Sequence, residues 1–148
     1  MEAVALLPQA WRDTARAMSQ ANVEIVRTVH DGWARGDFRV AQELFATDFS
    51  WDQPAAAVEP GSRRGPEVRD ALRNLFDVYD DYRVEASEFI DGGDEVVVVA
   101  RSKGTAKASR MELDQLFAFV WTVQGGRLAR LRVFTDREQA LKAAGQSE

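Results

Sequence analysis

The sequence contains no cysteine, which excludes disulfides, thiolate metal ligands and thiol catalysis. It has a single histidine, His30, and its carboxylates recur at no recognisable ligand spacing, so we expect no metal site. Purely apolar runs such as Val96 to Ala100 are far shorter than the roughly 20 residues of a membrane-spanning helix. We therefore predict a protein without metal, cofactor or membrane segment.

Excess positive charge is also missing, because 19 Lys and Arg face 24 Asp and Glu, giving a formal net charge of −5. Binding to nucleic acid needs a concentrated basic surface, so we expect no nucleic-acid partner. The start, Met1-Glu2-Ala3, lacks the cationic lead of a signal peptide, and Pro8 interrupts the nearest apolar stretch. These features predict a cytoplasmic protein.

A chain of 148 residues is long enough for one domain with one core. We expect an N-terminal extension at residues 1–18, partly helical or flexible, a single domain at residues 19–145 and a tail at residues 146–148. From Ser19, apolar residues recur at helical spacing as far as Trp33, and Gly36 can end this helix in a left-handed conformation.

Asp37 is expected to cap a second helix that buries Phe38, Ala41, Leu44 and Phe45. The aromatic run Phe49 to Gln53 is typical of a short strand, and Pro54 should end its pairing because proline has no amide hydrogen to donate. We expect a loop at residues 55–65.

Pro66 suits the first turn of a third helix. Four strands then follow, at residues 82–90, 95–103, 111–123 and 127–135, and Asp136 can cap a short final helix. The order predicts an α+β fold in which a cone-shaped, curved antiparallel sheet wraps around three N-terminal helices. The outer sheet face, with Leu116, Ala118, Val120 and Thr122, is too apolar for open water, so we expect a homodimer through it.

Several short segments resemble the nuclear transport factor 2-like superfamily, also called cystatin-like, and within it the SnoaL-like and ketosteroid-isomerase-like proteins. The resemblance extends from about Ala21 to Gly145. It rests on Val23-Glu24-Ile25-Val26-Arg27, Trp33-Ala34-Arg35-Gly36-Asp37, Trp51-Asp52-Gln53-Pro54, Arg64-Gly65-Pro66, Val120-Trp121-Thr122 and Thr135-Asp136-Arg137-Glu138.

The resemblance implies a pocket inside the cone, but the acid and base groups of steroid isomerases do not carry over. Gln53 stands where those relatives have a carboxylate before the proline, Val29 where they have a tyrosine, and Phe119 near their sheet acid. Many SnoaL-like relatives have His-Asp-Pro where this chain has Asp52-Gln53-Pro54, and a histidine where Phe119 stands. An amide has no useful basicity, and Val and Phe donate no hydrogen bond, so this constellation is absent.

Two residues are candidates for catalysis. His30 has a near-neutral ordinary pKa and lies on the first helix, although a lone helix histidine is more often a packing residue. Asp52 is the carboxylate nearest the expected base position, yet strand alternation should send Asp52 and Gln53 to opposite faces, and a solvated strand-end aspartate is the alternative.

Aromatic residues and an amide are the candidates for ligand binding, because aromatic walls favour a flat, apolar ligand. The expected set is Trp33, Trp51, Gln53, Tyr79, Phe119 and Trp121. Arg63 and Arg64, before the third helix, could attract an anionic group or simply face solvent. Arg101 is expected in outer-face ion pairs.

Three functions fit these observations. We favour binding of a small apolar or aromatic molecule, polyketide- or steroid-like, in a cavity with a degenerate acid/base site. A cofactor-independent cyclase, isomerase or hydrolase that uses His30 or Asp52 is the second alternative. A homodimerisation module without a ligand is the third.

Overall fold

The computed structural model describes residues 8–57 and 60–145 and begins with a single helix of 26 residues, α2 (Gln9–Ala34). The expected boundary at Ser19 does not interrupt this helix, because no proline or glycine lies between Gln9 and Asp31. No helix in these ranges is both long and apolar enough to span a membrane. The cytoplasmic location stays a prediction.

The predicted end of this helix at Gly36 is confirmed. Gly36 has a φ of 79°, and its amide donates to the Trp33 carbonyl while the amide of Asp37 donates to the Gly32 carbonyl. This pair of hydrogen bonds satisfies two carbonyls that the last helical turn leaves unpaired.

The second helix predicted after Asp37 is present, but it is much shorter than expected. The Asp37 carboxylate accepts a hydrogen bond from the Arg39 amide at 3.0 Å in a local turn, and Ala41 is left-handed with a φ of 57°. Such turns compete with helix formation, so only the short 3-10 helix η1 (Gln42–Leu44) forms. Strand β1 (Phe45–Gln53) follows at once.

The sheet has six described strands in the order β2-β1-β6-β5-β4-β3. After β1 come β2 (Gly61–Arg64), helix α3 (Pro66–Val78), β3 (Tyr79–Gly92), β4 (Glu95–Ala106), β5 (Glu112–Gln124) and β6 (Arg127–Phe134). The expected loop at residues 55–65 thus contains a strand, which pairs with β1 as far as Gln53, beside Pro54. The contact of β1 with β6 is parallel, so the sheet is mixed rather than wholly antiparallel.

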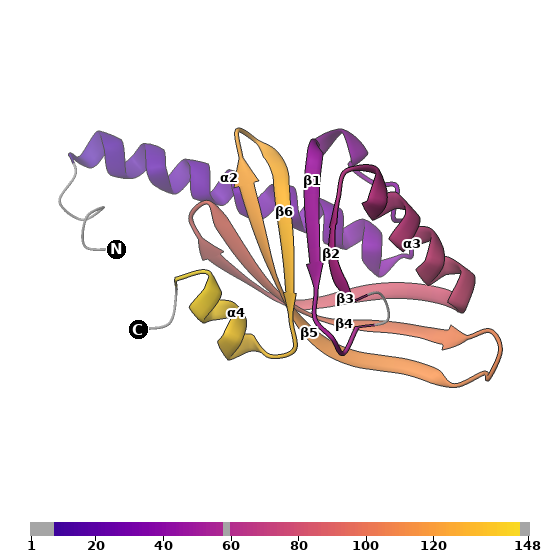
Figure 1. Cartoon of the computed structure of the whole chain (residues 1–148). Coiled ribbons are helices and arrows are strands. Elements are labelled where there is room, and N and C mark those ends of the chain that lie inside the picture. The colour runs from indigo at the N-terminus through magenta and orange to yellow at the C-terminus, as the bar shows by residue number, and fades with distance from the viewer. Residues whose placement is uncertain (1–7, 58–59, 146–148) are drawn as a thin grey trace.

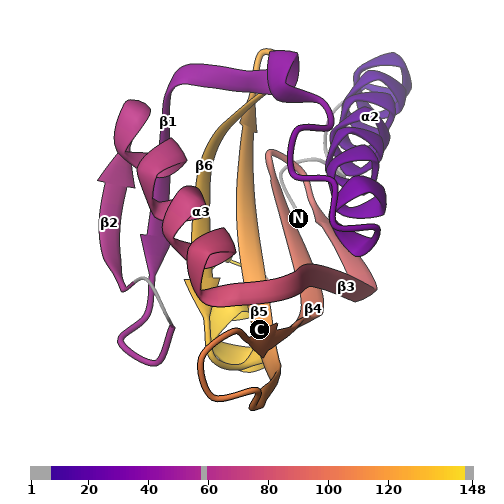
Figure 2. The same cartoon turned by 90° about the vertical axis from the view of Figure 1, so that its right-hand side faces the viewer.

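The predicted α+β cone is confirmed. The sheet is curved and unclosed, and α2 and α3 lie on its concave side (Figures 1 and 2). The short helix α4 (Arg137–Ala143) lies on the other side of the sheet (Figure 1). Its predicted cap is present, because the Asp136 carboxylate accepts from the Gln139 amide at 2.8 Å.

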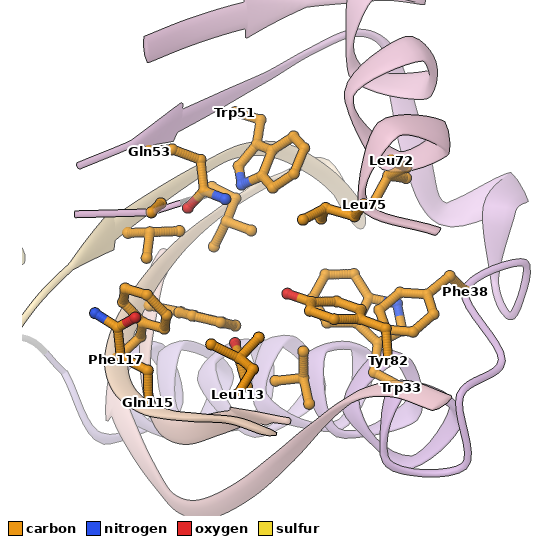
Figure 3. Close-up of a pocket in the computed structure, with 16 residues that line it drawn as sticks. Trp33, Phe38, Trp51, Gln53, Leu72, Leu75, Tyr82, Leu113, Gln115 and Phe117 are labelled. Carbon is orange, nitrogen blue, oxygen red and sulfur yellow. The ribbon is translucent and has the colours of Figure 1, made fainter. Parts of the chain in front are cut away.

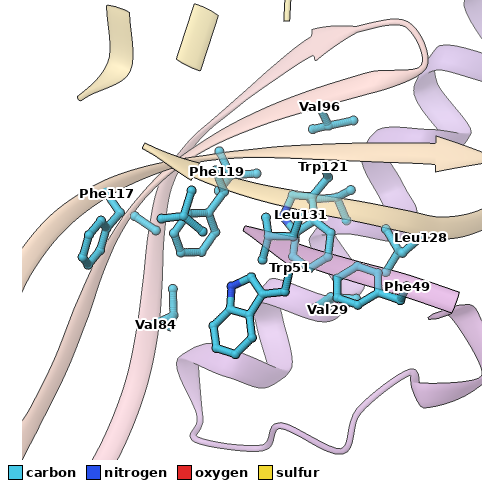
Figure 4. Packing of buried hydrophobic residues seen from close by; sticks show 14 of the residues in the cluster. Val29, Phe49, Trp51, Val84, Val96, Phe117, Phe119, Trp121, Leu128 and Leu131 are labelled. Atoms are coloured by element: carbon cyan, nitrogen blue, oxygen red, sulfur yellow. The ribbon is translucent and has the colours of Figure 1, made fainter. Parts of the chain in front are cut away.

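The inner core gathers around Trp121, which is fully buried (Figure 4). Its indole nitrogen donates to Nε2 of His30 at 2.9 Å, and His30 is only 1% exposed. The rings of Trp33, Phe89 and Phe119 also contact the imidazole. Burial penalises the charged imidazolium and lowers the pKa of His30 to about 3, so His30 is a neutral core residue.

The outer sheet face is less exposed than the sequence suggested. Val97, Ala118 and Val120 are buried in a cluster with Ala140 of α4. The Arg137 guanidinium holds the start of this helix to Glu88 of β3 through two contacts of 2.9 Å. Leu116 remains 41% exposed on this face. Helix α4 therefore shields much of the apolar outer face from water within the chain. This face was the reason for expecting a homodimer, and most of it needs no second subunit as cover.

Gly32 allows a close approach between α2 and the turn after it. A Cβ built on Gly32 would lie 2.2 Å from Cγ1 of Val40 and 3.1 Å from the Asp37 carbonyl oxygen. Although alanine favours helices, we expect Gly32→Ala to lower the free energy of unfolding by about 1–2 kcal/mol, measured by urea denaturation, because the overlap strains the turn. A smaller loss is expected in a Val40→Ala background. Equal losses in both backgrounds would contradict this explanation.

The buried imidazole predicts a pH dependence of stability. The folded-state pKa lies below the ordinary value of 6.5, so the unfolded chain takes up a proton first as pH falls. The free energy of unfolding should therefore fall as the pH falls below 6.5. The slope should be steeper in wild type than in His30→Gln, by about 1.4 kcal/mol per pH unit. Glutamine keeps an acceptor for Trp121. Urea denaturation between pH 7 and 4.5 measures both slopes, and parallel slopes would exclude His30 as the cause.

Candidate functional site

Strand β1 sends alternate side chains to opposite faces of the sheet. Trp51 and Gln53 line a chamber on the concave side, whereas Ser50 and Asp52 line a polar groove on the outer side. This arrangement follows from the two-residue period of a strand. The inner side of β1 therefore offers an aromatic ring and an amide, and the carboxylate lies on the other face.

The inner chamber lies between β1, α3 and the curved strands β3–β5 (Figure 3). Its volume is about 40 Å³, and none of the described residues that line it carries a charge. Its polar side chains include Gln53, Gln115, Tyr82 and Ser102. Its other lining residues are Trp33, Phe38, Trp51, Ala57, Leu72, Leu75, Val84, Leu113, Phe117, Phe119, Leu131 and Val133.

Tyr82 reaches the chamber because β3 is irregular at its start. The pairing of β3 with β4 shifts between Asp80 and Arg83, and Asp81 has a φ of 54°. Such a bulge re-aims side chains, and Gly104 on β4 leaves room, since a Cβ there would lie 3.4 Å from Cα of Tyr82. The Tyr82 hydroxyl points into the chamber (Figure 3).

Burial raises the pKa of the Tyr82 phenol, while a hydrogen bond with Ser102 acts in the opposite direction. The phenol is therefore protonated at neutral pH and can donate a hydrogen bond. Ser102 is itself only 4% exposed. The chamber thus has the Tyr82 hydroxyl on one side and the amides of Gln53 and Gln115 on the other (Figure 3), and Ser102 adds a second neutral hydroxyl to its lining.

A larger groove adjoins the chamber, with a volume of about 470 Å³. It lies between the end of α2, β1 and the start of α3, and Arg69 is its one charged residue among the described ones. The two spaces share five lining residues, which are Trp33, Phe38, Trp51, Leu72 and Leu131. Phe38 is one of these shared lining residues, and its ring contacts the rings of Trp33 and Tyr82.

The structure brings together four of the six residues expected to bind a ligand. Trp33 and Trp51 line both spaces, and Gln53 and Phe119 line the inner chamber. Trp121 lies deeper, fully buried against His30. Tyr79 lines neither space and contacts the ring of Tyr82 instead.

The two residues expected to be catalytic line neither of these spaces. His30 is enclosed by core rings, and its lowered pKa leaves it unprotonated across the neutral range. The Asp52 carboxylate accepts from Nε and Nη2 of Arg130 at 3.1 and 2.5 Å on the outer face. These placements argue against acid/base roles for either residue on a ligand in the chamber.

Other charged residues of the sequence also face outward. Arg101 pairs with Asp114 at 3.0 Å, as a cross-strand pair on the outer face. Arg63 and Arg64 lie on β2 rather than in a loop and line the polar outer groove with Asp52. Within residues 8–57 and 60–145, no three or more His, Asp or Glu side chains are grouped so that they could hold a metal ion.

Sequence reasoning missed Gln115, although its signal was present. Leu113, Gln115 and Phe117 alternate along β5 with Leu116 and Ala118, which were assigned to the outer face. The same alternation therefore places Gln115 inside. Tyr82 carried no such signal, because the bulge at Asp81 appears only when β3 and β4 pair.

Comparison with known proteins places this geometry in a family. The model of the SnoaL-like domain matches residues 25–131, and no match is found among curated proteins. The structure of a nuclear transport factor 2-like protein from Burkholderia thailandensis is 26% identical, with a TM-score of 0.70, and the match covers 85% of this chain and 98% of that one.

Two further structures share the fold and were obtained with small molecules. TerC co-crystallised with polyporic acid is 21% identical, with a TM-score of 0.66, over 86% of this chain and 99% of that one. A protein with a ketosteroid isomerase-like fold from Catenulispora acidiphila, in complex with trimethylamine, is 18% identical, with a TM-score of 0.61, over 84% of this chain and 94% of that one. Together with the cone and its concave site, the family match shows that this chain belongs to the SnoaL-like family.

Proposed function

We propose that this protein binds a small apolar or aromatic molecule in the groove and the adjoining chamber, without acid/base catalysis by His30 or Asp52. The observation that carries this proposal is the aromatic groove of about 470 Å³, which falls within the roughly 300–1,000 Å³ of typical ligand sites. Its walls include Trp33, Phe38 and Trp51, which favour flat rings.

The chemistry of the lining supports binding over proton transfer. A general base must lie within hydrogen-bond reach of the proton that it removes and have a pKa near the working pH. The chamber offers two amides, a phenol with a raised pKa and a serine, and none of these is a base at neutral pH. A cyclase, isomerase or hydrolase using His30 or Asp52 therefore has weaker support.

The relatives support the class of ligand only in general terms. TerC was crystallised with polyporic acid and the Catenulispora protein with trimethylamine, so proteins of this fold accommodate small organic molecules. For this chain, the groove has one cation, Arg69, and no carboxylate among its described lining residues, which disfavours cationic molecules.

Blocking the groove tests the proposal. Thr47 is exposed and lines the groove, and Thr47→Trp should fill it at little cost to stability. A thermal-shift screen of neutral fused-ring aromatics should raise the Tm of wild type and leave that of Thr47→Trp unchanged, because only a bound ligand stabilises the folded state. Asp48→Trp is the matched control, since Asp48 is exposed but does not line the groove. If no compound raises the wild-type Tm, the binding proposal fails.

We further propose that two copies associate through the outer sheet face, as the sequence led us to expect. The observations that support this interface lie around Leu116, which is exposed. Two ion pairs lie near it, Arg101 with Asp114 and Lys103 with Glu85. Charges of both signs around one apolar residue suit a symmetric contact, in which each patch meets a copy of itself.

Light scattering after gel filtration tests this association. Wild type should have the mass of a dimer, and Leu116→Glu should have that of a monomer, because the new carboxylate would be buried in the contact. Met111→Glu is the control, since Met111 is more exposed but lies in the turn between β4 and β5. A monomeric wild type, or a dimer that survives Leu116→Glu, would exclude this interface.

A further inference from the structure

The two adjoining spaces differ in size by about tenfold, and this difference limits how a ligand can lie. The groove has a volume of about 470 Å³, but the chamber has only about 40 Å³. A protein cavity that binds benzene has a volume of about 150 Å³. A ring therefore fits the groove and not the chamber, whereas a single polar substituent fits the chamber.

The chamber has its own set of polar groups, which differs from Gln42, Thr47 and Arg69 of the groove. The Tyr82 hydroxyl, Ser102, Gln53 and Gln115 line the chamber and are absent from the lining of the groove. All four are neutral, and Ser102 is 4% exposed. A charged substituent would lose its hydration there without meeting a counter-ion, which is costly in a buried site.

Tyr82 is the group best placed to meet such a substituent. Its ring packs against Phe38, which lines both spaces, and its hydroxyl points into the chamber (Figure 3). A protonated phenol donates one hydrogen bond, and a carbonyl oxygen accepts one. The amides of Gln53 and Gln115 lie on the opposite side of the chamber and can complete the polar surroundings.

We propose that the ligand is amphipathic and enters in one orientation, with its apolar ring in the groove and a neutral oxygen-bearing head, such as a ketone, inserted into the chamber beside Tyr82. This assignment rests on the proposed binding function. It names Tyr82 as the residue that selects ligands by their head group, and it predicts that a carboxylate head is rejected.

Three probes with the same ring test the assignment: 2-acetylnaphthalene, its hydrocarbon counterpart 2-isopropenylnaphthalene, and 2-naphthoate. Calorimetric titration of wild type should give the ketone about 2- to 10-fold tighter binding than the hydrocarbon, the gain expected of one hydrogen bond. Naphthoate should bind most weakly of the three. In Tyr82→Phe the ketone and the hydrocarbon should bind equally, with the affinity for the hydrocarbon unchanged.

Tyr79→Phe is the matched control, because Tyr79 contacts Tyr82 but lines neither space, and it should behave as wild type. If neither neutral probe binds wild type, the proposed function fails and this inference fails with it. If both bind, but the preference for the ketone is absent or survives Tyr82→Phe, the binding function stands and the orientation is overturned. Preferred binding of naphthoate would also overturn it.

Discussion

The alternation of side chains along β1 is the constraint on which the rest of the site depends. Trp51 and Gln53 face the concave side, and Asp52 between them faces the outer side, where Arg130 holds its carboxylate. A shift of one residue would exchange these faces and place a carboxylate inside the cone. Pairing with β2 on one side and β6 on the other fixes the register, so the chemistry of the chamber follows from the hydrogen bonds of the sheet.

The only histidine of the chain contributes to the core rather than to proton transfer. Its Nε2 accepts from Trp121, which joins α2 to β5 across the middle of the cone. Because aromatic rings surround the imidazole, its neutral form is strongly favoured and its pKa falls to about 3. The Trp121 indole thereby has a buried hydrogen-bond partner, which a large aromatic residue with a polar nitrogen needs in a core.

The curvature of the sheet leaves unequal spaces rather than one large cavity. Side chains from α2, α3 and the strands fill most of the cone, so that only about 40 Å³ remains in the inner chamber, and the wider groove opens where the short turns after α2 replace a helix. Packing therefore decides where a ring can lie, while the few buried polar groups decide which part of a ligand is tolerated deeper inside.

The fold was largely predictable, because helical spacing, turn residues and strand alternation are local properties. The structure keeps the predicted helix end at Gly36, the strand end before Pro54 and the helix start at Pro66. The Gly125-Gly126 turn joins β5 to β6. The short length of the second helix was not predictable, since it depends on the local turn at Asp37 and the left-handed conformation of Ala41. The cover of the outer face by α4 was also missed, because it depends on a contact between distant segments.

The sequence by itself determined that Val29, Gln53 and Phe119 stand at the positions compared with the acid and base groups of steroid isomerases, and these residue types cannot transfer protons. Only the tertiary structure decided which side chains line the site. Trp121 and Tyr79 are the same residue types as Trp51 and Tyr82, yet they do not line the site. The reason is physical: access to a cavity depends on the register of neighbouring strands, on one bulge at Asp81 and on how tightly distant side chains pack, and none of these is a local property of the chain.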